Sequence, residues 1–484
     1  MPCLSRIDHR RERQVDSLSY SFPRRSASWV RKLITRRKMP SLRNLALLSL
    51  ATLATAHGRT KRCKVPSQYA KSNGTLDDSP AIQKAFAKCG VNGVVEFGLG
   101  LDYNVLTPIK ATNLSNVEIS MLGNLHLPTN ITAVQEIVNA SGGNQQAGTL
   151  YWFWFAGPSI DYVGTSNVTT GWINSYGQQW WDTNPVNGTG AIARPHLLRF
   201  NTTNSVMNYY KSWKPIAWNT QLIGDNITVS NARIEATSNG GFPFNTDGFG
   251  VTGTNIIIQD SHISNGDDAI AVQSPSHNVT FRRNFVGYQS HGMSIGSLGQ
   301  NQAVAANVTN ILFDDNVASN ILYGARFKSW IGGKGIARNI TWSNIRLENV
   351  TQPILVTQTY VNQGSNQTQL FPGQVTGRPN NSSVIMENFN FVNISGSINS
   401  YNPGDGSCVT DPCWYNAGLP QLDGTQAIIV ECNTNSSCSD FKFTGIEIWP
   451  QKSEPASVIC FNATASLNPE LGFACQNGTF FPLE

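Results

Sequence analysis

The apolar positions of this chain recur in short bursts and lack the three-to-four-residue rhythm of an amphipathic helix. Five bursts of β-branched or aromatic residues each open directly after an asparagine, at intervals of 29, 23, 32 and 29 residues. These asparagines are Asn226, Asn255, Asn278, Asn310 and Asn339. Each unit predicts a strand, an Asn/Gly turn and another strand, at a period typical of solenoids. We therefore expect an all-β fold, a parallel β-helix in which each coil buries its inward side chains against the next.

One short helix is expected near the start of the solenoid. Asp78 stands where it can cap a helix, and Pro80 falls in the first turn. The apolar residues that follow share one helical face: Ala81, Ile82, Ala85, Phe86 and Cys89. We expect this helix to close one end of the core, and the cysteine-rich tail from Cys408 to protect the other. The run Tyr151–Phe155 fits a core strand better than a sugar-stacking platform.

The amino terminus resembles a targeting segment. From Met39 the chain carries Arg43, the apolar run Leu45–Leu53 and a small-residue cleavage site at 54–56, so residues 39–56 predict a secretory signal peptide. The apolar run is too short to span a membrane as a helix. Residues 1–38 are rich in Arg and Ser, and we interpret them as a non-native extension. A nucleic-acid-binding arm and a mitochondrial-type presequence are the alternatives.

Composition changes once that leader is set aside. The first 56 residues hold 12 Lys/Arg and 3 Asp/Glu, so the remainder has 23 basic and 27 acidic residues and a net charge of −4 in place of +5. Any attraction to a polyanion must therefore be local. No linker or low-complexity break follows residue 63, so residues 63–484 predict a single β-helix domain.

The cysteines agree with export. Eight remain beyond the leader: Cys63, Cys89, Cys408, Cys413, Cys432, Cys438, Cys460 and Cys475. None forms a C-x-x-C pair or a zinc spacing, so disulfides are the better interpretation. Pairing between sequence neighbours (63–89, 408–413, 432–438, 460–475) is the simplest connectivity, which the sequence alone leaves open.

About nineteen N-x-[ST] triplets suggest a glycoprotein. Several coincide with the asparagines of the repeat and are expected to serve structure. The remaining glycosylation candidates are Asn130, Asn167, Asn187, Asn201, Asn366, Asn435, Asn462 and Asn477.

Four short polar motifs follow one another, each in its own repeat-length segment. They are Asn245-Thr246-Asp247-Gly248, Gly266-Asp267-Asp268, Ser290-His291-Gly292 and Arg326-Phe327-Lys328. Equivalent positions on adjacent coils lie about 4.8 Å apart, so these residues predict one surface patch. Asp267 and Asp268 would diverge in a regular strand, so the strand must bend or end there, which Gly266 permits. Carboxylates this crowded cannot all ionise easily, and at least one should hold a proton near neutral pH.

Glycosidic cleavage requires a protonated carboxyl beside an ionised carboxylate. The four motifs, in this order, resemble those of glycoside hydrolase family 28, the polygalacturonases and their relatives. Further landmarks, at 177–182, 194–200 and 213–215, extend the likeness from about residue 77 to past Tyr360. The departures are Ser290 in place of a Gly and Phe327 in place of an aliphatic residue, and neither removes a reactive group. The resemblance implies a right-handed, pectin-lyase-like parallel β-helix and an inverting single displacement.

The same resemblance implies a role for each residue. Asp267 would be the general acid, and Asp247 with Asp268 would hold and deprotonate the attacking water. His291 would tune the protonation of the acid or bind substrate. Arg326 and Lys328 would hold the uronate carboxylate, because a planar guanidinium and an ammonium both suit that group. Asn245 and Tyr360 would support the substrate.

These observations predict a secreted, monomeric hydrolase of α-1,4-linked galacturonate in pectin, without cofactor, metal, nucleic acid or membrane partner. Exo-cleavage is favoured because residues 295–300 and 328–330 resemble exo-acting members. A segment between Gly142 and Trp181, including Trp180 and Trp181, would block the groove. Hydrolysis of rhamnogalacturonan or xylogalacturonan is the alternative within the family. Outside it, a calcium-dependent pectate lyase or a non-catalytic glycan-binding solenoid would share the expected fold.

Overall fold

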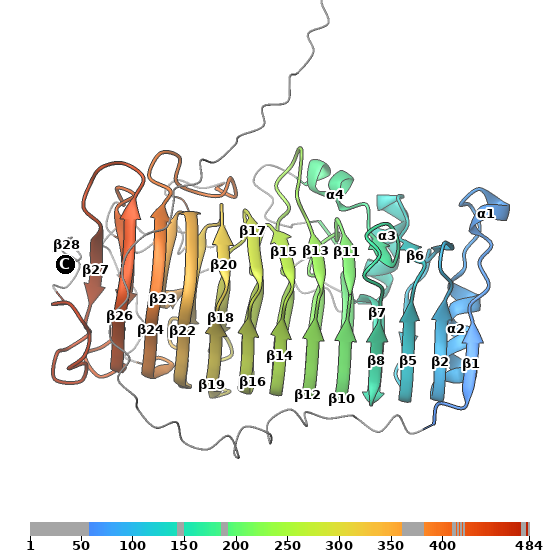
Figure 1. Cartoon of the computed structure of the whole chain (residues 1–484), viewed down its shortest axis with the longest axis horizontal. Helices are drawn as coiled ribbons and strands as arrows, with labels where there is room; N and C mark the ends of the chain where they lie inside the picture. The colour runs from blue at the N-terminus through green and yellow to red at the C-terminus, as the bar shows by residue number, and fades with distance from the viewer. Residues whose placement is uncertain are drawn as a thin grey trace, which may run out of the picture. The chain divides into compact units, whose positions relative to one another are not determined.

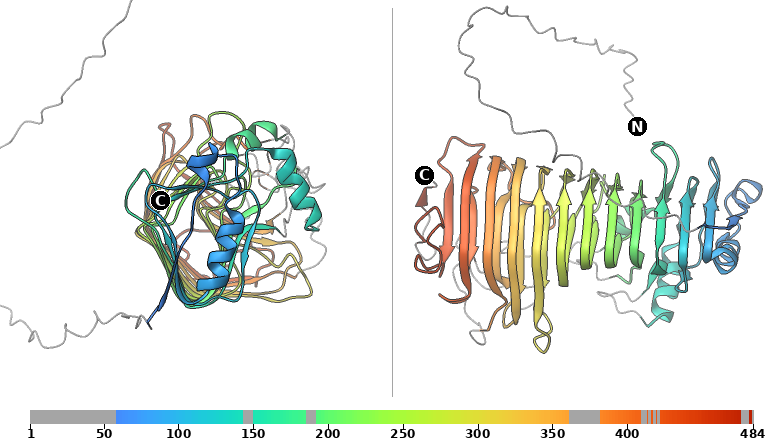
Figure 2. Two further views of the ribbon diagram at one scale, coloured as in Figure 1. Left: turned by 90° about the vertical axis from the view of Figure 1, so that its right-hand side faces the viewer. Right: turned by 60° about the horizontal axis from the view of Figure 1, so that its bottom comes forward.

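The computed structural model describes residues 58–142, 150–184, 192–360, 382–408, 413, 416, 419 and 422–475, and the backbone of 481–482. Within these residues the chain winds into a stack of coils built from parallel strands (Figure 1). Viewed from its amino-terminal end, the stack shows strands of successive coils lying in register behind one another (Figure 2). The predicted parallel β-helix is confirmed.

Three ladders of strands run the length of the stack. The first ladder consists of β1 (Lys61–Lys64), β2 (Val91–Phe97), β5 (Ser115–Met121), β8 (Ile160–Val163), the second halves of β10 (His196–Asn208), β12 (Thr220–Ser230), β14 (Phe249–Gln259) and β16 (Ile270–Arg282), then β19 (Ala306–Asp314) and the first halves of β22 (Gly335–Val350), β24 (Ile385–Ile398) and β26 (Cys438–Pro450).

The second ladder consists of β4 (Ile109–Ala111), β7 (Tyr151–Pro158), the first halves of β10, β12, β14 and β16, then β18 (Met293–Leu298), β21 (Tyr323–Trp330), β23 (Gln352–Tyr360), β25 (Gln426–Glu431), β27 (Ser457–Phe461) and the antiparallel β28 (Phe481–Pro482). The third consists of β3 (Asp102–Asn104), β6 (Asn124–His126), β9 (Trp172–Asn174), β11 (Lys211–Trp213), β13 (Arg233–Glu235), β15 (His262–Asn265), β17 (Phe285–Tyr288), β20 (Val317–Ser319) and the second halves of β22, β24 and β26.

The repeating asparagines lie at bends inside long strands. All five adopt a left-handed conformation, with φ between 55° and 58°, and so lie within β12, β14, β16, β19 and β22. The predicted turn at each asparagine is therefore a bend within one continuous strand, and it needs no separate loop. Asparagine tolerates this conformation better than most residues. Its side chain then stacks on the next coil, as where Asn339 Nδ2 donates to Asn310 Oδ1 at 2.9 Å.

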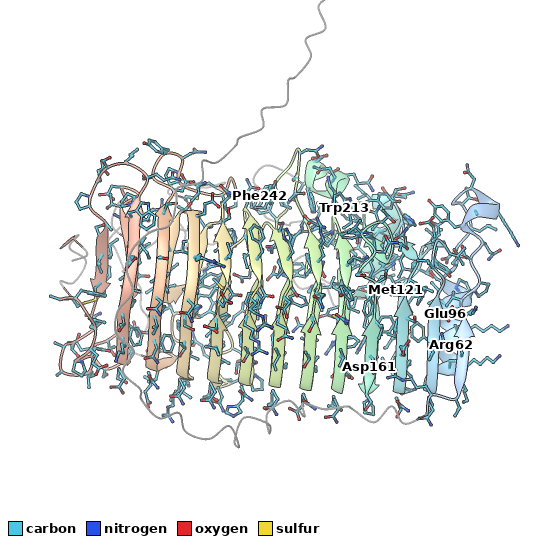
Figure 3. The ribbon with its side chains drawn as sticks, viewed as in Figure 1. Arg62, Glu96, Met121, Asp161, Trp213 and Phe242 are labelled. Carbon is cyan, nitrogen blue, oxygen red and sulfur yellow. A yellow bond between two sulfur atoms is a disulfide. The ribbon has the colours of Figure 1, made fainter. Side chains whose placement is uncertain are left out.

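The inside of the stack is apolar and its aromatic rings are stacked from coil to coil. Trp342 lies between Phe313 at 5.2 Å and Phe391 at 5.0 Å, in nearly parallel planes. In β7, Trp152, Phe153 and Phe155 are buried, which confirms the core interpretation of Tyr151–Phe155. Between coils, the outer surface carries ion pairs such as Arg62 with Glu96 on β1 and β2 (Figure 3).

Four helices decorate the described part of the stack: α1 (Tyr69–Ser72), α2 (Ser79–Cys89), α3 (Ile131–Ala140) and α4 (Gly177–Thr183). The predicted helix is α2, which lies across the amino-terminal coil (Figure 2) and buries Ile82, Phe86 and Cys89. Asp78 occupies the N-cap position, but its carboxylate accepts hydrogen bonds from the backbone of Gln68 and Asn104 in place of the helix. The predicted side-chain cap was therefore wrong. No helix in the described residues is long and apolar enough to cross a membrane.

All four neighbouring disulfides form, linking Cys63 to Cys89, Cys408 to Cys413, Cys432 to Cys438, and Cys460 to Cys475. The expectation for the tail needs one correction. The Cys460–Cys475 bridge lies at the carboxyl-terminal end of the stack, as expected. The Cys408–Cys413 bridge instead belongs to an excursion between β24 and β25 that folds back onto the polar motifs.

The glycosylation candidates fall in different settings. Asn130 and Asn167 are exposed, the former as the N-cap of α3, and Asn435 is exposed as well. Asn201 is half-buried in β10, and Asn462 Nδ2 already donates to the Cys432 carbonyl at 2.9 Å. Asn187, Asn366 and Asn477 lie outside the described residues. Glycosylation itself stays a prediction.

Candidate active site

The polar motifs meet where the third ladder passes into the second. Asp247 precedes β14, Asp267 and Asp268 lie between β15 and β16, and His291 lies between β17 and β18. The strand ends before the two aspartates, as predicted. Gly266 is needed there because a Cβ would lie 2.6 Å from the Pro243 ring, and its φ is not left-handed. Successive coils thus bring the three connections side by side.

Asparagine and threonine side chains fasten these connections. Asn265 Nδ2 donates to the carbonyls of Thr246, Asp267 and Asp268 at 3.0, 2.8 and 3.0 Å. Thr246 Oγ1 accepts from the Gly266 N–H at 2.9 Å. Because both side chains are buried, these bonds fix the backbone that carries the aspartates. No sequence motif marks Asn265.

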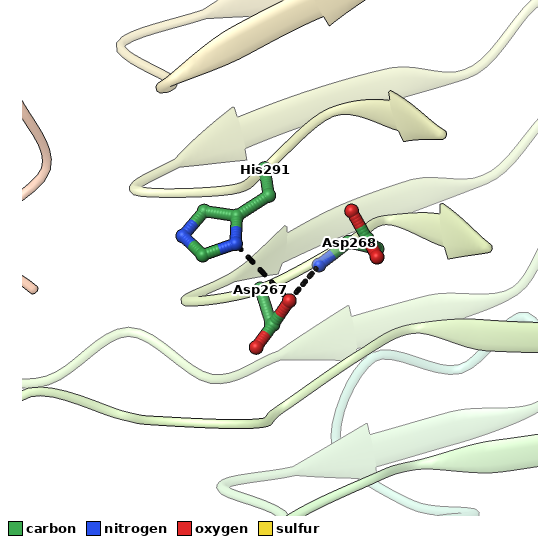
Figure 4. Close-up of side chains that lie close together, drawn as sticks. All are labelled: Asp267, Asp268 and His291. Atoms are coloured by element: carbon green, nitrogen blue, oxygen red, sulfur yellow. Dashed lines mark hydrogen bonds and ion pairs between the residues drawn. The ribbon is translucent and has the colours of Figure 1, made fainter. Parts of the chain in front are cut away.

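Asp267 and His291 form an ion pair at the centre of the site (Figure 4). His291 Nδ1 lies 3.1 Å from Asp267 Oδ1, and 18% of the Asp267 side chain is exposed. Burial alone would raise the pKa of Asp267, but the charge and hydrogen bond of His291, with the charge of Lys328, hold this pKa well below its usual range. The pKa of the carboxyl predicted to be the general acid is therefore held low, which favours its ionised form, and the His291 imidazole beside it is its hydrogen-bond partner.

Among the crowded carboxylates, Asp247 is the one whose pKa favours keeping the predicted proton. Burial, followed by the charges of Asp267 and Asp268, raises the pKa of Asp247 well above its ordinary value. Within the described part of the chain, Asp247 Oδ1 is buried and has no hydrogen-bond partner. A carboxyl oxygen enclosed without a partner is a position that a bound water or hydroxyl would satisfy.

Asp268 is enclosed by cations. Lys328 Nζ lies 2.6 Å from its Oδ2, Arg326 Nη1 lies 3.3 Å from its Oδ1, and Ser294 Oγ donates to Oδ1 at 2.5 Å. The carboxylate is 2% exposed. The two cations predicted to pair with a substrate carboxylate thus already share an internal one. They lie two residues apart along β21, and both contact the same carboxylate.

Further residues surround these charges. Asn245, in a left-handed conformation, has its Nδ2 3.5 Å from Asp267 Oδ2, and its Oδ1 accepts from Arg194 at 2.7 Å. The ring of Tyr360 lies 5.8 Å from the Arg326 guanidinium and 5.4 Å from Lys328 Nζ. Tyr323 lies nearer, at 4.1 Å from the guanidinium. Arg194 appeared in the sequence only within a family landmark, and no motif marks Tyr323.

One residue from far along the chain completes the site. Asp405, in the excursion after β24, accepts from His291 Nε2 at 2.8 Å and is fully buried. No motif marks it in the sequence. His291 therefore contacts a carboxylate at each ring nitrogen, and although burial opposes its charge, Asp267 and Asp405 raise the pKa of His291 to about 9.

Helix α4 forms a wall of polar contacts with residues 238–241, which precede Asn245 in the chain. In this wall, Gln178 Nε2 donates to Ser238 Oγ at 2.9 Å and Asp182 Oδ1 accepts from the Gly241 N–H at 2.7 Å. Trp180 and Trp181 belong to α4, and their rings are buried in the core. They therefore do not line a groove themselves, and blocking of the groove by the segment that contains them stays a prediction.

The carboxylates and imidazole lie close enough to raise the question of a metal. Ligand-type atoms of Asp267, Asp268 and His291 fall within 4.8 Å of one another. However, His291 Nδ1 is directed at Asp267, and both oxygens of Asp268 accept from Ser294, Arg326 or Lys328. The groups satisfy one another and form an acid–base cluster. That the protein uses no metal stays a prediction.

Several known proteins are similar to this chain over most of its length. Probable exopolygalacturonase C of Neosartorya fischeri is 56% identical over 442 residues, which cover 90% of this chain and 97% of the relative. The protein of the same name from Aspergillus niger is 56% identical over 425 residues, covering 88% and 93%. Endo-xylogalacturonan hydrolase from Aspergillus tubingensis has a TM-score of 0.65 at 19% identity, covering 86% of this chain and 99% of its own.

The structural likeness is one of fold and agrees with the predicted right-handed parallel β-helix. At the level of sequence, the model of glycosyl hydrolases family 28 matches residues 103–413, the span that carries all four motifs and the excursion with Asp405. Together with the 56% identity across nearly the whole length of the relatives, this match is decisive: the chain belongs to glycosyl hydrolases family 28.

Proposed function

We propose that this protein is a secreted exopolygalacturonase that removes galacturonate from the ends of α-1,4-linked galacturonate chains in pectin. The name shared by relatives at 56% identity supports this substrate and this mode of cleavage. The observation that carries the proposal is the partly exposed Asp267 beside a charged His291, with Asp247 and two buried cations around it.

The chemistry proposed is a single displacement with inversion. Asp267 donates a proton to the glycosidic oxygen as the C–O bond breaks, and a water held by Asp247 and Asp268 attacks the anomeric carbon and loses its proton to Asp247. Before substrate binds, the proton rests on Asp247 and Asp267 is ionised. The reactive state therefore holds the same number of protons, with one moved from Asp247 to Asp267. Such a cluster titrates as a unit.

Uronate recognition is assigned to the cations. Arg326 and Lys328 balance Asp268 in the structure, and a substrate carboxylate would share their positive charge. A planar guanidinium can bind a carboxylate through two hydrogen bonds, which a neutral sugar cannot accept in the same way. Asn245, held by Arg194, and Tyr360, beside both cations, are proposed to complete the binding of this sugar.

We assign exo-action to the wall of polar contacts that α4 forms with residues 238–241, since these residues lead into Asn245 along the chain. Export is supported by the signal-like segment 39–56 and by four disulfides, which form in oxidising compartments. The protein is proposed to act as a monomer.

Product analysis tests the proposal. The purified protein is incubated separately with polygalacturonate, rhamnogalacturonan and xylogalacturonan, and early products are resolved by size. We expect monomeric galacturonate from polygalacturonate within the first minutes, with slow loss of viscosity. Early oligomers would contradict exo-action alone, and faster cleavage of rhamnogalacturonan or xylogalacturonan would reassign the substrate.

Proton NMR of fresh product tests the mechanism. Inversion predicts the β-anomer before mutarotation, and an α-anomer appearing first would contradict it. The lyase alternative is tested in the same reactions, because a lyase would give an unsaturated, ultraviolet-absorbing product and would lose activity with a calcium chelator.

A further inference from the structure

Asp405 is a buried carboxylate supplied by a distant part of the chain. It lies in the excursion between β24, which ends at Ile398, and β25, which begins at Gln426, and it meets His291 across a separation of 114 residues. Its side chain is 0% exposed. Burying a carboxylate is costly unless it is paired and hydrogen-bonded, so this contact calls for a specific use.

Its own loop holds this carboxylate in place. Asp405 Oδ1 accepts from the N–H of Ser407 at 2.9 Å and from its hydroxyl at 2.6 Å. The Gly404 N–H donates to Thr351 Oγ1 at 3.0 Å, and Cys408 is bridged to Cys413. The two bonds to Ser407 and the disulfide lie within the loop, and the bond to Thr351 ties the loop to the coil that contains β23. The contacts of the loop therefore fix the direction of Asp405 Oδ2 independently of His291.

The groups that face His291 can be named from each neighbouring element. Asp267 faces Nδ1 at 3.1 Å, Asp405 faces Nε2 at 2.8 Å, and the Tyr323 ring from β21 presents an edge at 6.0 Å. The positive charges of Lys328 and Arg194 also interact with the Asp267 carboxylate. Because both ring nitrogens face carboxylate oxygens, both act as donors only if the ring is an imidazolium.

We propose that Asp405 is a positioning residue that keeps His291 protonated and keeps its Nδ1–H directed at the general acid Asp267. This inference rests on the proposed roles of Asp267 and His291. Asp405 touches neither substrate nor reacting atoms and acts through the imidazole.

The consequence for catalysis follows from the proton balance. When Asp267 gives its proton to the leaving oxygen, an O–H bond forms, the C–O bond breaks, and Asp267 becomes a carboxylate 3.1 Å from Nδ1–H. An imidazolium stabilises that new negative charge. A neutral ring anchored to Asp405 would keep its proton on Nε2 and turn a bare Nδ1 lone pair toward Asp267, which would oppose the step.

The pH profile of Asp405→Asn tests this role. In wild type the His291 proton, for which the pKa is about 9, contributes a basic limb to kcat/KM beside the limb of the proton shared by Asp247 and Asp267. Removing the Asp405 charge lowers this pKa, so the limb should move to lower pH by at least about one unit, since a neighbouring opposite charge is worth roughly one to three units. A fall in activity that is uniform with pH would overturn the proposal.

Ser407→Ala is the matched control. It removes a hydrogen bond to the same carboxylate but leaves the charge, so its basic limb should stay within a few tenths of a unit of wild type. If Ser407→Ala moves the limb as far as Asp405→Asn does, loop disorder explains both and the proposal fails.

A measurement on the wild-type protein keeps the inference testable if Asp405→Asn does not fold. The imidazole ¹⁵N resonances of His291, identified by their loss in His291→Gln, should titrate near pH 9 with both nitrogens protonated below that pH. A midpoint at or below the ordinary value of about 6.5 would overturn the proposal. This readout needs no substrate, so its failure is distinguishable from a failure of the proposed enzymatic function, which Asp267→Asn tests separately.

Discussion

The solenoid has two edges with the same coil spacing, the row of asparagine bends and the row of active-site connections, and this spacing stabilises the first row but destabilises the second. At the bends inside the long strands, stacked asparagines donate to one another from coil to coil, as Asn278 does to Asn255 at 2.7 Å. At the passage from the third ladder to the second, the stacked groups are the carboxylates of Asp247 and Asp267, which repel. Spacing that stabilises a row of amides therefore destabilises a row of acids, and the second edge needs Arg326, Lys328 and His291 to offset that repulsion.

The two edges also differ in regularity. The asparagine bends keep φ near 55° in every coil and need no connecting loop. The site connections span residues 236–248, 266–269 and 289–292, so the first is much longer than the other two. The repeating edge supplies a fixed frame, and variable connections on the other edge place reactive groups on it.

The largest contrast should come from Asp267→Asn. The amide cannot donate the proton, so kcat should fall by at least about a hundredfold, as is typical of general acid catalysis. The protein should still fold, but with a lower thermal midpoint, because the ion pair with His291 that holds the pKa of Asp267 low also stabilises the folded state. Asp225→Asn is the control, because Asp225 belongs to the amide row and accepts from Asn255 at 3.2 Å. Its kcat should equal wild type. More than about a hundredth of wild-type activity in Asp267→Asn would contradict its role.

Lys328→Ala and Arg326→Ala should have the next largest effect. Each removes a charged contact to a uronate, worth about 1.5–3 kcal/mol or roughly 10- to 150-fold in kcat/KM on polygalacturonate. Methyl-esterified chains should be affected much less. Because Asp268 is buried against both cations, each variant should also unfold at lower temperature.

Arg338→Ala provides the comparison for these cations. Arg338 pairs with Glu387 on the first ladder, where its side chain is 45% exposed, and exposed pairs contribute little. It should alter neither kinetics nor unfolding. Equal losses on free and esterified substrates in Lys328→Ala would remove the cation from substrate recognition.

A smaller effect on the opposite edge is expected from Asn339→Ala. Asn339 donates to Asn310 and accepts from Asn388, both at 2.9 Å, with φ of 56°. Loss of these bonds and strain of an alanine at positive φ should lower the free energy of unfolding by about 2–3 kcal/mol. Asn339→Gly, which relieves the strain, should cost about half as much. Denaturant unfolding measures both, and a change in kcat of either variant would mean the two edges are not independent.

The smallest effect should be a gain in stability from Asp247→Asn. Burial and neighbouring charges raise the pKa of Asp247 in the folded state, so this residue costs stability as pH rises through that value. The amide removes the cost, so the thermal midpoint should rise at pH 7, and the difference from wild type should vanish below about pH 4, near the unfolded pKa. A lower midpoint at pH 7 would show that Asp247 is better satisfied than its unpartnered Oδ1 indicates.

Prediction from sequence succeeded where the repeat itself carries the information. The asparagine period predicts the stacked coils, and motif spacing predicts that Asp247, Asp267 and His291 meet, because neighbours one coil apart in sequence are neighbours in space. It failed for the side-chain cap by Asp78, whose carboxylate accepts from the backbone of Gln68 and Asn104. A local pattern does not report which distant group will satisfy a side chain.

Asp405 shows the same limit within the site. Its loop is an excursion outside the repeat, and its partner His291 lies 114 residues earlier. The protonation of the site is only partly predictable for a related reason: adjacency predicts that one carboxyl keeps its proton, but which one depends on where His291 and Lys328 lie. Those positions are properties of the packed site.

The covered ends of the stack have a consequence for association. A parallel β-helix has two terminal coils, each with unpaired backbone donors and acceptors that could template another chain. Helix α2 lies across the first coil with Ile82 and Phe86 buried, and β28 pairs antiparallel with β27 near the last. A chain shortened through α2 would thus expose an adhesive sheet edge, and its defect would be growth into end-to-end assemblies rather than simple unfolding.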